Sequence, residues 1–444
     1  MSLPARRTVR RSLTTVVVTA AASGLLATPA SAAQRSPSEY LLAADPAAGA
    51  VYVYRTSDMK RTGALDDLAL SSHVGTLQLP DGRVIMIDDE RATVDAVRVN
   101  AKGRPKVVDS AKIPGADWEG ATWAAADSRL RYLAFSGEGT DEQAPVTVVD
   151  LKTFAIHQVQ VPVEADSSGK VSETQVYLAG RPLQLVVTTG GEFRAAPLST
   201  VLATQAFTPT SRAPVGTGTH GPVVSRDGDA VFSTTADGFD GASLTGDSLR
   251  SPRSVAYSTA RDVVQNYRPR LAADGRTVLG AVAEDTGLSA DQWADTRNDV
   301  NIIDTSTFTS SLVRLPDGQA GRLALSERYA AVATIHPDGD TLTLLDVKRS
   351  SSTYRRVVGT VALPASARGP VAGQPTTGAQ THFAALSSSG SRAFVTNGGD
   401  GKIVVVDTAH RKIRRTVSTP TPLTNGGYLT VIKKGTPVTD LVAR

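Results

Sequence analysis

The chain has 444 residues, of which 47 are basic, 43 are acidic, six are histidine and none is cysteine, for a formal net charge of +4. The lack of cysteine excludes disulfide bonds, a lipoprotein anchor, a thiol nucleophile and thiolate metal ligands. Outside the first thirty residues we find no long apolar pattern of helical period, so an all-β fold is expected.

The first 32 residues have the pattern of a secretory signal peptide. Four arginines between residues 6 and 11 precede an apolar run from Leu13 to Ala27, and residues 30–32 offer a small-residue cleavage site. The apolar run is too short for a membrane anchor, and the pair Arg10-Arg11 also resembles a twin-arginine signal. Removal of this segment would take four arginines and no acidic residue, so we expect a neutral, secreted mature chain with no affinity for nucleic acid.

After this segment the sequence contains a repeat of apolar strand, turn and apolar strand. A third strand follows in most repeats and often ends in aspartate, and a fourth, more polar strand comes after it, as at residues 412–417. Four strands in roughly 40–50 residues, repeated around a ring, are the signature of a β-propeller. The turns fall at Gly82, Asp127-Ser128, Gly180-Arg181, Gly228, Gly275, Glu327-Arg328, Gly390 and Gly435, and the aspartate-ended strands at residues 146–150, 300–304, 342–346 and 403–407.

Both ends of the chain are expected to contribute to one blade. Tyr428–Ile432 reads as a first strand with too little chain after it, whereas Tyr40–Ala44 and Val51–Tyr54 are two strands without a first strand of their own. A blade completed in this way leaves no open sheet edge. We therefore predict eight blades rather than seven, in a single domain over residues 40–444, preceded by a short linker at residues 33–39. The least regular repeat is 236–261.

Charged residues of the expected loops separate by sign. In a propeller the turns joining strands one to two and three to four lie on one face, and the remaining loops lie on the other. The first face collects arginines and lysines, so we predict a basic face and an acidic face whose local fields can steer a ligand. Shared ancestry of the repeats is the alternative explanation. The predicted acidic loops carry Asp88, Asp89, Glu90, Glu138, Asp141, Glu142, Asp237, Asp240, Asp247, Glu284, Asp285, Asp291, Asp295, Asp338, Asp340 and Asp400.

Three of the histidines occupy one position of the repeat. His73, His220 and His382 each lie just before the first strand of a blade, on the acidic side, and Glu119 and Glu173 hold the equivalent position in two other blades. Equivalent positions of a radial repeat converge on the axis. Imidazole and carboxylate groups bind zinc at about 2.0–2.2 Å, so these five residues are a candidate divalent-metal site. A small-molecule site and a purely structural role are the alternatives.

Common enzyme motifs are absent from the sequence. It contains no His-Glu-x-x-His, no Gly-x-Ser-x-Gly and no phosphate-binding glycine loop. This favours binding over catalysis, although a Ser-His-acid arrangement can also assemble from distant residues.

Residues 393–408, Ala-Phe-Val-Thr-Asn-Gly-Gly-Asp-Gly-Lys-Ile-Val-Val-Val-Asp-Thr, resemble the repeat of the YVTN β-propeller family. Its members are extracytoplasmic binding proteins and some quinoprotein-like or lactonase-like relatives. The histidine before an apolar strand and a glycine turn is also similar to secreted zinc-metallochaperone propellers, which hand zinc to the binding protein of an importer. Those proteins usually carry a mobile histidine-rich segment, whereas this sequence has no histidine before His73.

The resemblances imply a secreted, monomeric, ligand-binding propeller, with zinc as the candidate metal and an importer's binding protein as the candidate partner. A lactonase-like hydrolase that uses the central channel and a scaffold that binds cell-wall polymer are the alternatives.

Overall fold

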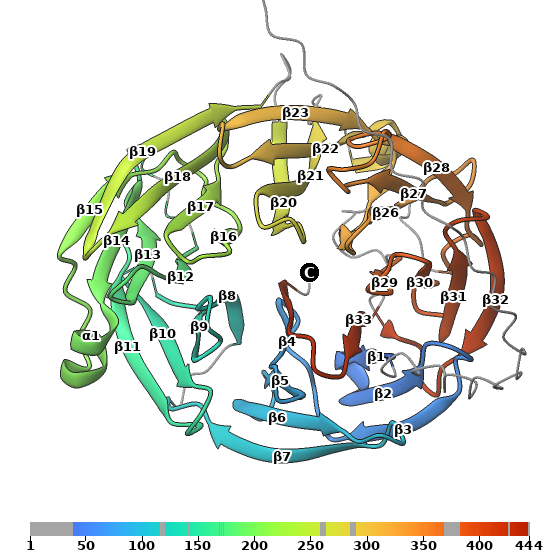
Figure 1. The fold of residues 1–444 in the computed structure, drawn as a ribbon, viewed down its shortest axis with the longest axis horizontal. Helices are drawn as coiled ribbons and strands as arrows, with labels where there is room; N and C mark the ends of the chain where they lie inside the picture. Colours follow the sequence, from blue (N-terminus) through green and yellow to red (C-terminus); the bar gives the residue numbers. More distant parts are fainter. Residues whose placement is uncertain are drawn as a thin grey trace, which may run out of the picture. The chain divides into compact units, whose positions relative to one another are not determined.

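Eight antiparallel sheets form a closed ring around a central axis in the computed structural model, so the predicted eight-bladed β-propeller is confirmed (Figure 1). The structure describes residues 39–442 except 116–119, 141, 168, 170, 172, 258–262, 285–289, 368–381 and 425–426. Among these residues no helix is long and apolar enough to cross a membrane.

The first four blades are numbered along the ring and described from the axis outwards. Blade 1 contains β33 (Tyr428–Lys433), β1 (Glu39–Asp45), β2 (Ala50–Arg55) and β3 (Arg61–Asp66), with a 3₁₀ turn at Pro46–Ala48. Blade 2 contains β34 (Val438–Val442), β4 (Val74–Gln78), β5 (Arg83–Asp88), β6 (Thr93–Val99) and β7 (Pro105–Lys112). Blade 3 contains β8 (Ala121–Ala126), β9 (Tyr132–Gly137), β10 (Gln143–Asp150) and β11 (Ile156–Pro162). Blade 4 contains β12 (Gln175–Ala179), β13 (Gln184–Thr189), β14 (Glu192–Pro197) and β15 (Ser211–Pro214), with α1 (Leu198–Thr204) before its last strand.

The other four blades complete the ring. Blade 5 contains β16 (Pro222–Val224), β17 (Ala230–Thr234), β18 (Gly238–Thr245) and β19 (Ser248–Ala256). Blade 6 contains β20 (Val263–Leu271), β21 (Thr277–Glu284), β22 (Arg297–Asp304) and β23 (Thr309–Arg314), with the 3₁₀ segment η2 (Ala290–Asp295) between β21 and β22. In blade 7, β24 (Gln319–Ala320) and β25 (Ala324–Leu325) both pair with β26 (Tyr329–Ile335), followed by β27 (Thr341–Asp346) and β28 (Val357–Ala362). Blade 8 contains β29 (Ala384–Leu386), β30 (Arg392–Thr396), β31 (Lys402–Asp407) and β32 (Lys412–Ser418).

The two ends of the chain close the ring as the sequence predicted. Strand β33 pairs antiparallel with β1, with Tyr40 opposite Ile432 and Ala44 opposite Tyr428. The chain then turns at Gly435 and adds β34 to the inner edge of β4, in the next blade. This second connection was not predicted. Leu441 of β34 is buried between blades 2 and 3.

Apolar contacts between neighbouring blades form the core. In β31 the residues Ile403 to Val406 are all nearly inaccessible to solvent, because a middle strand is covered by another blade on each side. Phe394 of β30 is fully buried and belongs to a cluster that joins blade 8 to blades 1 and 2. The short, uninterrupted apolar runs that marked the third strands in the sequence are therefore explained by burial on both faces.

The aspartates that end the third strands hold the following turns. Asp150, Asp304, Asp346 and Asp407 each accept a hydrogen bond from the backbone N–H two or three residues later, at 2.8–3.0 Å. Aspartate is favoured at such positions because its short side chain can mimic a backbone acceptor in a turn. The repeated aspartate seen in the sequence thus has a local structural cause.

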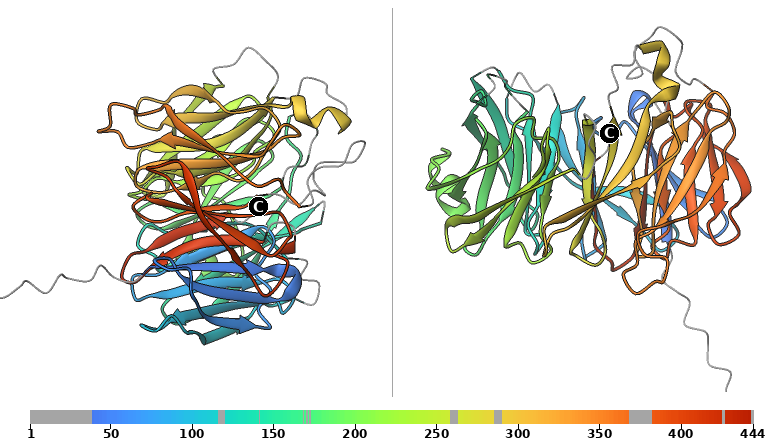
Figure 2. Two further views of the ribbon diagram at one scale, coloured as in Figure 1. Left: turned by 90° about the vertical axis from the view of Figure 1, so that its right-hand side faces the viewer. Right: turned by 90° about the horizontal axis from the view of Figure 1, so that it is seen from above.

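The loops joining strands two and three project from one face of the ring, where η2 lies (Figure 2). Most residues predicted in acidic loops are found there. Asp141 and Asp285 lie outside the described residues, and Asp88 and Glu284 are the last residues of β5 and β21. Two further residues are placed differently: Asp247 lies in the turn between β18 and β19 on the opposite face, and Asp240 lies within β18 and is buried. Both belong to the irregular repeat 236–261, where the sequence did not show that residues 238–245 form the third strand.

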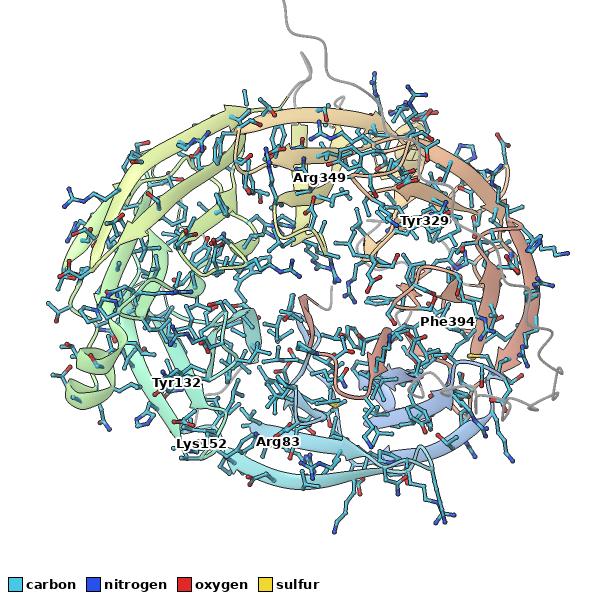
Figure 3. The ribbon with its side chains drawn as sticks, in the orientation of Figure 1. Arg83, Tyr132, Lys152, Tyr329, Arg349 and Phe394 are labelled. Carbon is cyan, nitrogen blue, oxygen red and sulfur yellow. The ribbon has the colours of Figure 1, made fainter. Side chains whose placement is uncertain are left out.

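Several arginines of the basic face connect neighbouring blades (Figure 3). Arg83 of blade 2 donates to the Leu151 carbonyl oxygen of blade 3 at 2.7 Å. Arg349 of blade 7 forms ion pairs of 2.7 Å with Asp274 and Asp304 of blade 6. Arginines of this face therefore help to join one blade to the next.

Candidate site at the channel mouth

The predicted metal-binding residues lie in different blades at the same end of the ring. His73 precedes β4 in blade 2, Glu173 precedes β12 in blade 4, His220 precedes β16 in blade 5 and His382 precedes β29 in blade 8. Glu119, predicted for blade 3, lies outside the described residues. The common location does not give these side chains a common environment.

His382 is buried and bonded at both ring nitrogens. Its Nδ1 lies 2.7 Å from the carbonyl oxygen of Thr396, and its Nε2 lies 2.8 Å from Oδ2 of Asp340. A carbonyl and a carboxylate can only accept hydrogen bonds, so both nitrogens donate. In this arrangement His382 has no lone pair to offer a metal ion.

Asp340 joins His382 to two loops. Its Oδ1 accepts a hydrogen bond from the backbone N–H of His336 at 3.0 Å, and its Oδ2 accepts one from Ser366 at 2.6 Å. Burial alone would raise the pKa of Asp340, but the hydrogen bonds from His382 and from the two backbone groups outweigh this effect and lower the pKa. The carboxylate is therefore ionised, and the pair fastens loops of blade 7 to the start of blade 8.

A second cluster forms where blades 3, 4 and 5 meet. The Trp123 indole N–H donates to Oε2 of Glu173 at 2.7 Å. The Trp123 and His220 rings pack edge to face, with centroids 4.7 Å apart and planes at 82°. Trp123 is buried and Glu173 is exposed. This cluster brings Glu173 and His220 to the two sides of one tryptophan.

His73 lies within electrostatic reach of the same cluster. Desolvation lowers the pKa of His73 and the positive charge of Arg268 lowers it further, against the opposing effect of Glu173, Asp89 and Glu138. The imidazole is therefore neutral at pH 7. Its Nδ1 is 3.0 Å from Oγ of Ser72.

Asp89 connects the starts of blades 2 and 3. It accepts backbone hydrogen bonds from Ser72 at 3.2 Å and from Ala121 at 3.1 Å. Burial raises the pKa of Asp89, against these hydrogen bonds. Its position supports the predicted acidic character of this end of the channel.

The arrangement places two imidazoles and several carboxylates along an arc from blade 2 to blade 5. Among the described residues, no group of three or more histidine, aspartate or glutamate side chains is close enough to hold a metal ion. Metal coordination at this arc would therefore require side-chain movement or a ligand from outside the described residues. His382, on the far side of the ring, does not belong to the arc.

Trp123 was not identified as a site residue from the sequence. A β-bulge between β8 and β9 shifts the register between Ala121 and Trp123. The signal that could have identified it is a single tryptophan in a strand of otherwise small residues. A large side chain on an inner strand is expected to contact residues of other blades.

Comparisons with known proteins show similarity of fold. Neither a family model nor a curated protein matches this sequence. Two structures of AztD from Citrobacter koseri, one described as apo, have TM-scores of 0.62 and 0.63 at 13% identity, over 89% of this chain and 98% of AztD. The dihydro-heme d1 dehydrogenase NirN, in complex with DHE, has a TM-score of 0.55 at 16% identity, over 89% of this chain and 75% of NirN. At these identities the likeness extends to the propeller fold alone.

Proposed function

We propose that the protein is an extracytoplasmic ligand-binding propeller that captures a divalent metal at the arc formed by His73, Glu173 and His220. Zinc is the first candidate for this metal. The observation that supports this most is the grouping of two imidazoles and a carboxylate at one channel mouth, with the pKa of His73 lowered so that the ring is neutral at pH 7. Neutral imidazole is the form that binds metals.

An open arc suits capture and release better than permanent retention. In a structural zinc site, four protein ligands fill the coordination sphere, whereas exchangeable or catalytic sites keep an open coordination position. The nearby carboxylates of Asp89 and Glu138 would raise the local concentration of cations. Delivery to a partner such as an importer's binding protein is consistent with a site of this kind.

Zinc affinity of protein purified without a histidine tag tests the proposal. Competition with a chromophoric chelator should show one bound zinc, and His220→Ala or His73→Ala should weaken binding by about tenfold or more, because each removes one of few ligands. His157→Ala, in the outermost strand β11, is the matched control. The proposal would be contradicted if His157→Ala lost as much zinc affinity as His73→Ala and His220→Ala, or if the wild-type protein bound no zinc.

One observation favours a hydrolase as the second candidate. Oγ of Ser72 lies within hydrogen-bond reach of His73 Nδ1, which is the spacing of a nucleophile and its base. Ser72→Ala should abolish hydrolysis of a simple lactone if this pair is catalytic. The wall-scaffold alternative is less favoured because Arg349, Arg276 and Arg83 of the basic face are paired with aspartates.

A further inference from the structure

Trp123 contacts two of the three residues of the metal-binding arc and comes from a different blade than either of them. It belongs to β8 of blade 3, whereas Glu173 precedes β12 of blade 4 and His220 precedes β16 of blade 5. The indole N–H donates to Oε2 of Glu173 at 2.7 Å, and the His220 ring packs against the indole with centroids 4.7 Å apart. One side chain therefore connects the two groups across three blades.

The backbone that carries Trp123 is held by contacts within its own blade. The register of β8 on β9 shifts between Ala121 and Trp123, so that Thr122 forms a β-bulge. Oγ1 of Thr122 lies 2.9 Å from Oγ of Ser136, which is fully buried. Bulges of this kind commonly re-aim a side chain beside a functional site.

The hydrogen bond between Trp123 and Glu173 satisfies one group and restrains the other. Trp123 is 6% exposed, and the N–H of a buried indole needs an acceptor. Glu173 is exposed, and an exposed glutamate otherwise has many accessible rotamers. Because each carboxylate oxygen has two lone pairs, the bonded group can still bind a metal ion.

The aromatic contact restrains the imidazole of His220. Its backbone is already fixed, because its N–H donates to the carbonyl oxygen of Thr234 at 3.0 Å and its own carbonyl accepts from Oγ1 of the same residue. Rings that pack edge to face have a preferred relative orientation. The indole therefore adds a restraint on the side chain, which the backbone contacts do not supply.

We propose that Trp123 is a positioning residue for the metal capture proposed above, and that it holds Glu173 and His220 at a fixed separation without binding the metal itself. The two ligands come from separate blades, so no single strand sets their spacing. A side chain that contacts both can set it. Groups that orient metal ligands typically change metal affinity by about 10–100-fold when they are substituted.

A double-mutant cycle on zinc affinity tests this role. Trp123→Phe keeps a ring beside His220 but removes the N–H donor, so it should weaken zinc binding by about tenfold. Glu173→Gln removes the charged ligand and should also weaken binding. When both changes are combined, Trp123→Phe should weaken binding by no more than about twofold further, because the group that it positions no longer binds the ion. Trp293→Phe, in η2, is the matched control and should leave binding unchanged.

A second measurement follows the hydrogen bond in the metal-free protein. The indole N–H resonance of Trp123 should move in Glu173→Gln, because a neutral acceptor replaces a charged one. This measurement needs no substitution of the buried tryptophan, so it decides the question if Trp123→Phe does not fold. The melting temperature of Trp123→Phe shows whether it does.

Four results would overturn the proposal: wild-type zinc affinity in Trp123→Phe, additive losses in the double variant, an unchanged indole resonance in Glu173→Gln, or an equal loss in Trp293→Phe. The wild-type protein separates this proposal from the proposed function. If the wild type binds no zinc, the metal function is contradicted. If the wild type and Trp123→Phe bind zinc equally well, the positioning role alone is contradicted.

Discussion

His220 and His382 occupy the same position of the repeat but have different neighbours. His382 is enclosed in a buried ion pair with Asp340, whereas His220 packs against the edge of Trp123 beside the exposed Glu173. The position in the repeat determines where a side chain lies in a propeller. The loop of the preceding blade determines what that side chain can do.

The difference can be traced to one position in the preceding blade. Asp340 is the residue just before the third strand of blade 7. The equivalent residue is Gly191 in blade 4, which precedes His220, and Gly49 in blade 1, which precedes His73. A glycine has no side chain, so these two positions cannot supply the carboxylate that Asp340 supplies to His382.

Breaking the buried pair should have the largest effect on stability. Asp340→Ala leaves the buried His382 ring and the backbone N–H groups of His336 and Ser366 without their acceptor, and loss of one partner of a buried pair costs about 3–5 kcal/mol in free energy of unfolding. The two side chains are 3% and 1% exposed, so water cannot replace the missing partner. Chemical denaturation measures the change.

The matched control removes an aspartate from an exposed pair. Asp317 pairs with Arg314, and both side chains are more than two-fifths exposed, so Asp317→Ala should cost about 1 kcal/mol or less. If the two variants lose the same free energy, the buried pair does not fasten blades 7 and 8 as described.

The pH dependence of stability should reveal the same pair with a smaller effect. Hydrogen bonds lower the pKa of Asp340 below its ordinary value of 3.8. A lowered pKa contributes stability that is present above the unfolded-state pKa and is lost as the pH falls through the folded-state pKa. The difference in free energy of unfolding between wild type and Asp340→Asn should therefore shrink as the pH falls from about 5 to below 3.8. A difference that grows on acidification would contradict this assignment.

A substitution near His73 should change the pKa of this histidine and leave the free energy of unfolding nearly unchanged. Arg268 lowers the pKa of His73, so Arg268→Gln should raise the pKa of His73 toward its ordinary value. The shift of the His73 imidazole proton resonance with pH measures the change, and Arg250→Gln is the control at a distant surface. An unchanged or lowered His73 pKa in Arg268→Gln would show that these charges do not interact across the mouth.

The strands and the closed ring could be predicted because they follow from local patterns. Turn residues such as Asp81-Gly82, apolar third strands and their final aspartates each repeat with a physical cause, and the unpaired strands at residues 40–44 and 428–432 require each other. The radial position of the histidines followed from the same repeat. These features needed no knowledge of contacts between distant side chains.

The chemistry of the site depended on contacts that the repeat does not encode. The pairing of His382 with Asp340 joins residues of different blades, and the place of Trp123 depends on a β-bulge that shifts one strand by a residue. The irregular repeat was placed wrongly for Asp240 and Asp247 because two strands there lack the usual pattern. Strand β34 was missed because blade 2 already contains four strands without it, so the repeat did not require a fifth.

The double closure by β33 and β34 has a consequence for how the chain reaches its native state. Gln78 bonds to the backbone of Lys433 through both ends of its amide, a contact that spans 355 residues. Blades 1 and 2 therefore lack their inner strands until the last part of the chain has been made. Contacts of such long sequence separation slow folding because a large loop must close before they form. We expect the ring to close only after β33 and β34 have been made, so until then blades 1 and 2 each keep an open inner sheet edge.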